Sequence, residues 1–135
     1  MKERLTKQSA ALPCPGWFRP DGLADAEVLS VSVVTAPADR SVGVTGCRYL
    51  CIRLDAAQAM LDRDVHELRL YSPRVTEGGD DFDAFAGCWW FSDTLTPGVG
   101  TGKPYTLTVD FKSRAGVRRL TVSFVLAEVI RGNAQ

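Results

Sequence analysis

Hydrophobic and polar residues alternate with a period of two along much of the chain, the spacing that places side chains on opposite faces of a β-strand. The last third shows this pattern most clearly, because two alternating runs flank a glycine-containing turn at residues 113–116. Such a pair of runs predicts a β-hairpin with one hydrophobic face and one polar face. The hydrophobic members are Tyr105, Leu107, Val109 and Phe111 in the first run, and Leu120, Val122, Phe124 and Leu126 in the second.

Earlier segments carry the same signal. A strand is predicted to begin at Val28 and to end before an interruption at 36–41, with Leu29, Val31 and Val33 on one face. Further strands are predicted over 47–54, 68–71 and 85–91. The stretch 76–83 is acidic and contains two adjacent glycines, so it is predicted to be a flexible loop.

Two segments depart from the strand pattern. Residues 56–63 contain no β-branched residue and are rich in Ala, Leu, Met and Gln, and Asp55 before them can cap a helix. They predict one short helix of about two turns inserted between strands. Residues 1–27 contain clustered prolines and glycines, which predict an irregular arm packed on the body through Trp17 and Phe18.

Together these segments predict one domain of the all-β class. We expect an antiparallel β-sandwich over residues 28–130, with the arm at 1–27 packed on it and the short helix near 56–63. The length of 135 residues is typical of one domain, and 45% hydrophobic with 24% charged residues is typical of a soluble globular protein.

Charge and hydropathy exclude several classes of protein. Sixteen basic and sixteen acidic residues give a formal net charge of zero, which argues against a basic nucleic-acid-binding tail and an acidic disordered segment. No apolar run approaches the roughly 18 residues that span a bilayer, so no membrane association is expected. No apolar secretory core follows the charged start, so we expect a cytoplasmic protein or export by a signal-independent route.

The passage Leu95-Thr96-Pro97-Gly98, followed after a loop by Tyr105-Thr106-Leu107-Thr108-Val109, resembles fibronectin type III and related bacterial immunoglobulin-like domains. The resemblance covers roughly residues 95–129. It implies that Tyr105 forms a tyrosine corner, with its hydroxyl bonded to nearby backbone. It also implies an immunoglobulin-like scaffold used for binding and spacing rather than for chemistry. Leu107 stands where antibody-type domains place a cysteine, so their inter-sheet disulfide is not expected.

Four cysteines are too few for a disulfide scaffold of this length. If Cys47 and Cys51 share one strand, their α-carbons are separated by about 13 Å, beyond the reach of a disulfide or of one zinc ion. The expected state of Cys14, Cys47, Cys51 and Cys88 is therefore a free thiol, mostly buried.

The acidic loop offers hard oxygen ligands. Glu77 with Asp80, Asp81 and Asp83 suits calcium at the end of a sandwich, although the spacing is not that of an EF-hand. The alternative is a solvated loop. The only histidine, His66, has no nucleophile motif near it, which indicates a surface histidine and no enzyme active site.

Trp89 and Trp90 are adjacent, so on a strand one indole enters the core and the other cannot. The outward ring either lies beneath a loop or the arm, or is exposed as an interface anchor. Basic residues gather around the final hairpin, apart from the acidic loop, and indicate either a charged binding surface or a solvated turn that prevents edge pairing. They are Lys103, Lys112, Arg114, Arg118 and Arg119.

These features favour a non-enzymatic protein–protein interaction module without a cofactor, whose partner is another protein. The expected surface combines the outward ring of Trp89 or Trp90 with Lys112, Arg114, Arg118 and Arg119. A small module rich in Ala, Val, Asp and Arg suits a bacterial or phage accessory protein. Two alternatives remain open: a barrel that binds single-stranded nucleic acid, and a carbohydrate-binding sandwich whose indole stacks on a pyranose ring.

Overall fold

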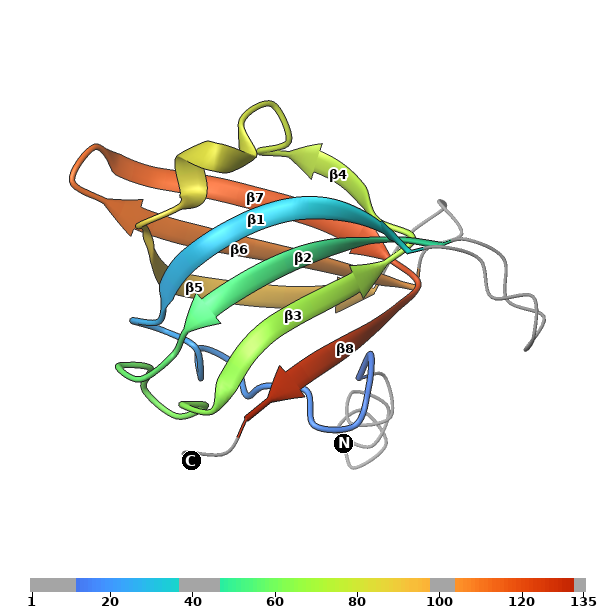
Figure 1. Cartoon of the computed structure of the whole chain (residues 1–135), viewed down its shortest axis with the longest axis horizontal. Coiled ribbons are helices and arrows are strands. Elements are labelled where there is room, and N and C mark those ends of the chain that lie inside the picture. The colour runs from blue at the N-terminus through green and yellow to red at the C-terminus, as the bar shows by residue number, and fades with distance from the viewer. Residues whose placement is uncertain (1–11, 37–46, 98–103, 133–135) are drawn as a thin grey trace.

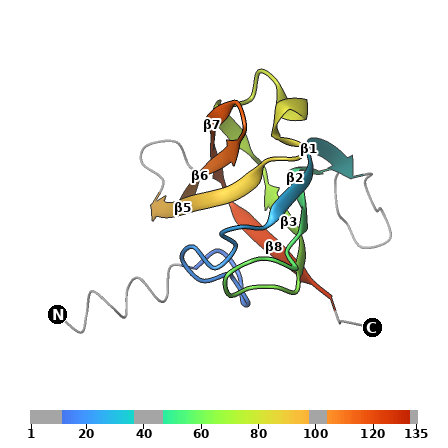
Figure 2. The ribbon, with the colours of Figure 1, turned by 90° about the vertical axis from the view of Figure 1, so that its left-hand side faces the viewer.

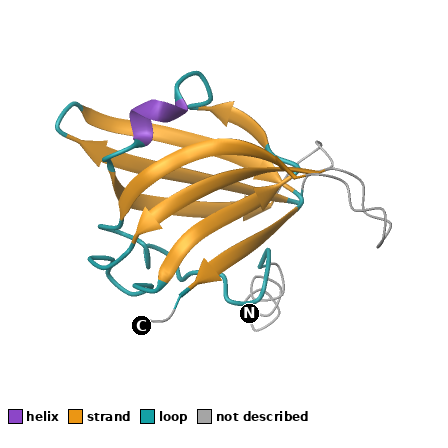
Figure 3. Cartoon of the chain, viewed as in Figure 1, coloured by secondary structure: helices purple, strands orange, loops and turns teal. Residues whose placement is uncertain are grey.

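The computed structural model describes residues 12–36, 47–97 and 104–132. Its strands pair only antiparallel and belong to one hydrogen-bonded sheet, in the order β4-β7-β6-β5-β1-β2-β3-β8. The predicted all-β antiparallel class is therefore confirmed (Figure 3). The strands are β1 (Glu27–Ala36), β2 (Cys47–Asp55), β3 (Val65–Tyr71), β4 (Arg74–Glu77), β5 (Trp89–Pro97), β6 (Tyr105–Ser113), β7 (Gly116–Phe124) and β8 (Leu126–Arg131), and the 3-10 helix η2 spans Phe82–Phe85.

The sheet folds over on itself, so that strands β1, β2, β3 and β8 lie across β4, β7, β6 and β5 (Figures 1 and 2). On one side, β3 continues into β4 through Ser72 and Pro73, while β7 continues into β8 through Val125. The Val125 amide donates to the Tyr71 carbonyl at this crossing. The two paired segments thus pass together from one layer to the other. Across the described residues, no helix is long and apolar enough to cross a membrane.

Aromatic side chains contact one another in series through the core between the layers. The Trp90 ring packs edge-on against Phe111 at 5.5 Å between ring centroids, and Phe111 packs against Phe85 at 5.1 Å. The irregular segment before β1 adds Phe18, which is buried and contacts Trp90, and Trp17, which stacks on Phe18 at 4.4 Å. The arm is therefore attached through the two aromatic residues that the sequence indicated.

The prediction that Leu29 shares a face with Val31 and Val33 is wrong. The pairing of β1 with β2 shifts register between Val28 and Ser30, which is a β-bulge. The extra residue turns Leu29 outward, where 48% of its surface is exposed, while Val28 and Val31 are both buried.

The predicted helix over 56–63 is also wrong, because this segment forms turns. Its amides bond outside the segment: Met60 donates to the Ala24 carbonyl, and Leu61 and Asp62 donate to that of Gly22. A two-turn helix gains little from its own hydrogen bonds, so contact with the arm decides the conformation. Ala56 and Ala59 are buried beneath these turns.

Other boundaries also differ from expectation. The predicted acidic loop overlaps the end of the short strand β4 and the start of η2, and the strand expected over 85–91 runs over Trp89–Pro97 instead. Leu126, expected on the inner face of the last strand, begins β8 beyond the crossing and is 50% exposed.

The Tyr105 hydroxyl bonds to a distant part of the chain. It donates to the backbone carbonyl of Leu12 at 3.3 Å, 93 residues earlier in the sequence. The Tyr105 ring stacks on Phe124 at 5.5 Å. In this fold the residue attaches the arm to the start of β6.

Candidate functional site

The two adjacent tryptophans have opposite surroundings. Trp90 is fully buried, and its Nε1 donates to the Asp93 carboxylate at 2.8 Å. Trp89 is 47% exposed. The arm covers Trp90 through Phe18 and leaves the Trp89 ring uncovered on the outer face. Trp89 is therefore the outward ring, and Trp90 belongs to the core rather than to a binding surface.

Trp89 lies in the middle of a row of outward side chains that crosses five neighbouring strands. Register pairs Asp55 with Glu27, Glu27 with Trp89, Trp89 with Lys112, and Lys112 with Val117. All five residues are exposed. We call this set the tryptophan row; it places two carboxylates on one side of the indole and a lysine on the other.

A second β-bulge enlarges the hydrophobic part of this face. The pairing of β5 with β6 shifts register between Trp90 and Ser92, and Phe91 is left 51% exposed. The Lys112 ammonium lies 4.6 Å from the centre of the Phe91 ring, in a cation–π contact. Val117, at the end of the row, is 61% exposed.

A pocket of about 440 Å³ lies at the acidic end of the row, beside the Trp89 ring. The Asp25 amide donates to the Trp90 carbonyl at 2.7 Å, and Asp25 holds a left-handed φ of 77°. The Asp55 carboxylate accepts the Ala57 amide at 3.1 Å, which fixes the turn that replaces the expected helix. The pocket is lined by Asp25, Glu27, Asp55, Ala57, Gln58 and Trp89.

The negative charge of this pocket is not offset by an ion pair within the described part of the chain, where none of the ion pairs includes Asp25, Glu27 or Asp55. By contrast, Asp110, on the strand that carries Lys112, holds Arg119 at 2.7 Å. The acidic end therefore presents net negative charge next to an exposed indole.

The basic residues of the final hairpin have different contacts. The Arg118 guanidinium lies over the Phe85 ring at 5.6 Å, whereas Arg119 donates two hydrogen bonds to Asp110, at 2.7 and 3.2 Å. Arg114 is exposed in the turn. Lys103 lies outside the described residues. Of the expected set, only Lys112 lies beside Trp89.

The expected separation of acidic loop and basic hairpin is wrong. Because β4 pairs with β7, Glu77 and Asp80 line the same pocket of about 460 Å³ as Arg118 and Arg119. No three His, Cys, Asp or Glu side chains in the described ranges are arranged to hold a metal ion. The structure thus does not bring the expected calcium ligands together; they were Asp80, Asp81 and Asp83.

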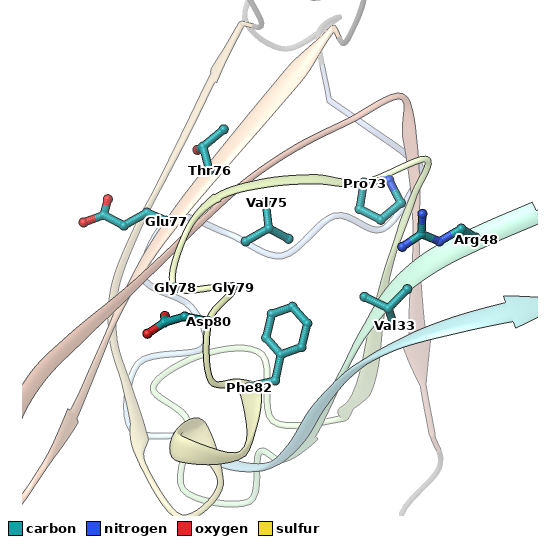
Figure 4. Close-up of a pocket in the computed structure, with 10 residues that line it drawn as sticks. All are labelled: Val33, Arg48, Pro73, Val75, Thr76, Glu77, Gly78, Gly79, Asp80 and Phe82. Atoms are coloured by element: carbon teal, nitrogen blue, oxygen red, sulfur yellow. The ribbon is translucent and has the colours of Figure 1, made fainter.

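Another pocket, of about 530 Å³, lies at the β4 edge of the sheet (Figure 4). Figure 4 shows Val33, Val75 and Phe82 lining its interior, with Arg48 at the rim and Glu77 pointing away. Val33 lies near the far end of β1 from Glu27, so this pocket is separate from the tryptophan row. Its walls are polar and apolar in equal parts, and Val33, Val75 and Phe82 pack against the core.

The cysteines and the histidine stay apart from this face. Cys14, Cys51 and Cys88 are free thiols, and burial with the neighbouring Glu67 carboxylate raises the pKa of Cys51 to about 11. Cys47 shares β2 with Cys51, as expected, and its side chain lies outside the described residues. His66 is exposed on β3.

Comparison with protein-family models, with curated proteins and with solved structures found no match to the chain. The residues of the face are therefore assigned from geometry alone. Sequence reasoning found Trp89 and Lys112 but missed Phe91, Glu27 and Asp55. The run Trp89-Trp90-Phe91 carried a signal for Phe91, because consecutive residues of a strand point to opposite faces, so Phe91 is expected on the same face as Trp89 when Trp90 points inward.

Proposed function

We propose that this chain is a non-enzymatic protein-binding module whose contact surface is the tryptophan row together with Phe91. The observation that supports it is the exposure of two large aromatic rings on β5, Trp89 and Phe91, which are two residues apart in the sequence. Exposed aromatic rings rimmed by polar groups are typical of protein interfaces, where tryptophan often contributes a large part of the binding energy.

The backbone that carries these rings supports the same proposal. Trp89 lies where β5 is bonded to β6 on one side and to β1 on the other, and the Trp90 amide donates to the Ala26 carbonyl at 2.8 Å. Side chains on such strands are held in place before a partner arrives. Binding then costs less conformational entropy than it does for a surface made of loops.

Nucleic-acid binding is a weaker proposal for this surface. Phosphate recognition needs several basic side chains on one face. Here Arg118 lies over the Phe85 ring, Arg119 is held by Asp110, and the row itself carries two carboxylates. A single-stranded nucleic acid would meet repulsion at one end of the exposed indole.

Carbohydrate binding is the second candidate, and the pocket beside Trp89 favours it. An indole face flanked by an amide and carboxylates, here Gln58 with Glu27 and Asp55, suits stacking on a pyranose ring with hydrogen bonds to its hydroxyls. Titration with oligosaccharides would then quench tryptophan fluorescence in the wild type and not in Trp89→Phe. A protein-binding module gives no such response.

The test of the proposed function is affinity capture from native cell extract with the wild type and Trp89→Ala. A matched control is Leu126→Ala, because Leu126 is a hydrophobic side chain of similar exposure, 50%, on β8. We expect a captured protein that Trp89→Ala loses and Leu126→Ala retains. Equal capture by all three proteins would contradict the proposal. Trp90→Ala is unsuitable because it opens a cavity in the core.

A further inference from the structure

We propose that the acidic end of the tryptophan row receives a lysine or arginine side chain from the protein partner. This inference rests on the proposed function and adds the chemistry of the partner. The occupant is an extended protein segment whose basic side chain enters the pocket between Trp89 and the three carboxylates of Asp25, Glu27 and Asp55.

Two features of the pocket select the same kind of side chain. The face of an indole attracts a cation through its ring electrons. Carboxylates attract a cation through charge, and they bond well to the guanidinium of arginine. Asp25, Glu27 and Asp55 supply three carboxylates around one half-exposed indole, and within the described ranges no basic side chain pairs with them.

The other end of the row gives the segment a direction. Lys112 follows Trp89 across the sheet, so a segment lying along the row meets negative charge, then the indole, then positive charge. Glu27 and Lys112 are two strands apart, which is about 10 Å at the usual spacing between strands. That distance corresponds to about three residues of extended chain. The fitting segment therefore carries a basic residue, an apolar residue after it, and an acidic residue about three positions from the first.

The test is a titration of ¹⁵N-labelled full-length protein, followed through the indole N–H signal of Trp89 and assigned with Trp89→Phe. The probes are two blocked peptides, Ac-Gly-Arg-Leu-Ser-Glu-Gly-NH₂ and the same peptide with Gln in place of Arg. We expect a saturable shift with the arginine peptide, weakened by added salt, and at least about tenfold weaker binding of the glutamine peptide.

Charge variants locate the effect. We expect binding of the arginine peptide to be at least about tenfold weaker in a triple variant that combines Asp25→Asn, Glu27→Gln and Asp55→Asn. These changes keep side-chain size, and asparagine tolerates the left-handed φ of Asp25. The matched control, combined Asp80→Asn, Asp81→Asn and Asp83→Asn, changes net charge equally and is expected to bind like the wild type.

The outcomes are separable from those of the proposed function. Equal binding of both peptides, no saturable shift up to about 10 mM arginine peptide, or equal weakening by both triple variants overturns the basic-side-chain inference. If Trp89→Ala still loses a captured protein, the binding module stands without it. A Trp89 shift with oligosaccharide and with neither peptide overturns both.

Discussion

At the residue scale, the surface formed by the tryptophan row and Phe91 depends on a polar contact beneath it. Trp90 donates its indole N–H to Asp93, and the Asp93 amide donates to the Asp21 carboxylate at 3.2 Å. Burial raises the pKa of Asp93, the negative charges of Asp21 and Asp62 add to this, and the hydrogen bond from Trp90 opposes it. The contact fixes the inward ring, and with it the outward direction of Trp89.

The burial of Asp93 makes stability depend on pH. The unfolded chain loses the Asp93 proton near the usual pKa of about 3.9, whereas the folded chain holds it to higher pH. The group therefore favours folding below about pH 4, and that contribution is lost as pH rises through the folded pKa. We expect the unfolding free energy of the wild type, relative to Asp93→Asn, to fall as pH rises above about 4, measured by urea denaturation. A difference that rises with pH, or does not change, would contradict this assignment.

A second residue-scale prediction concerns Cys51. Its pKa of about 11, raised by burial and by Glu67, leaves almost no thiolate at pH 8, and the side chain is buried. We expect iodoacetamide to modify Cys51 at least about 100-fold faster in urea than in the folded protein, measured by mass spectrometry of the peptide that carries it. Comparable rates in both states would place the thiol at the surface.

At the element scale, the irregular segment before β1 is a structural part of the domain. Asp62, only 6% exposed, accepts the Arg19 amide at 3.0 Å and the Arg131 guanidinium at 3.1 Å, which joins the arm to β8. Gly22 is required beside it, because a β-carbon there would lie 2.0 Å from the Asp62 carboxylate. The arm thus holds the turn at 56–63 that walls the acidic pocket.

Asp62→Asn tests this connection against a matched variant. The asparagine amide would place a donor against a donor, so we expect a loss of about 1–3 kcal/mol in unfolding free energy. Asp64 also bonds to Arg131, at 2.7 Å, but is 50% exposed. Asp64→Asn is expected to cost less than about 1 kcal/mol in the same denaturation experiment. Equal losses would show that Asp62 does not join the arm to β8.

Several elements were predictable because their signal is local. Period-two alternation and the turn at 113–116 defined the hairpin, and the structure pairs Ser113 with Gly116 as expected. The bulges at Leu29 and Phe91 were not predictable, since they arise where β1 and β5 meet and the sheet folds over. The prediction of a helix at 56–63 was wrong for a similar reason: its amides donate to the carbonyls of Ala24 and Gly22, 36 to 40 residues earlier in the sequence.

At the scale of the whole molecule, the candidate face exists only because five strands align. Asp55, Glu27, Trp89, Lys112 and Val117 come from distant parts of the sequence, and register alone makes them neighbours. The same topology places Glu77 and Asp80 beside Arg118 and Arg119, so the acidic loop and the basic hairpin are not separated as the sequence indicated. The sequence showed which single residues could contact a partner. It did not show which of them lie together, because that depends on which strands pair, and the alternation of hydrophobic and polar residues does not specify the pairing.

The proposed binding surface depends on Trp89 facing outward and Trp90 facing inward, and one measurement tests both positions directly. A soluble paramagnetic agent is added to ¹⁵N-labelled protein, and the indole N–H signals, assigned with Trp17→Phe and Trp89→Phe, are followed. We expect the Trp89 signal to broaden strongly, and the Trp90 signal, bonded to Asp93, to be the least affected of the three. If the Trp89 signal were protected and the Trp90 signal broadened, the two faces of β5 would be assigned the wrong way round, and the tryptophan row would not exist.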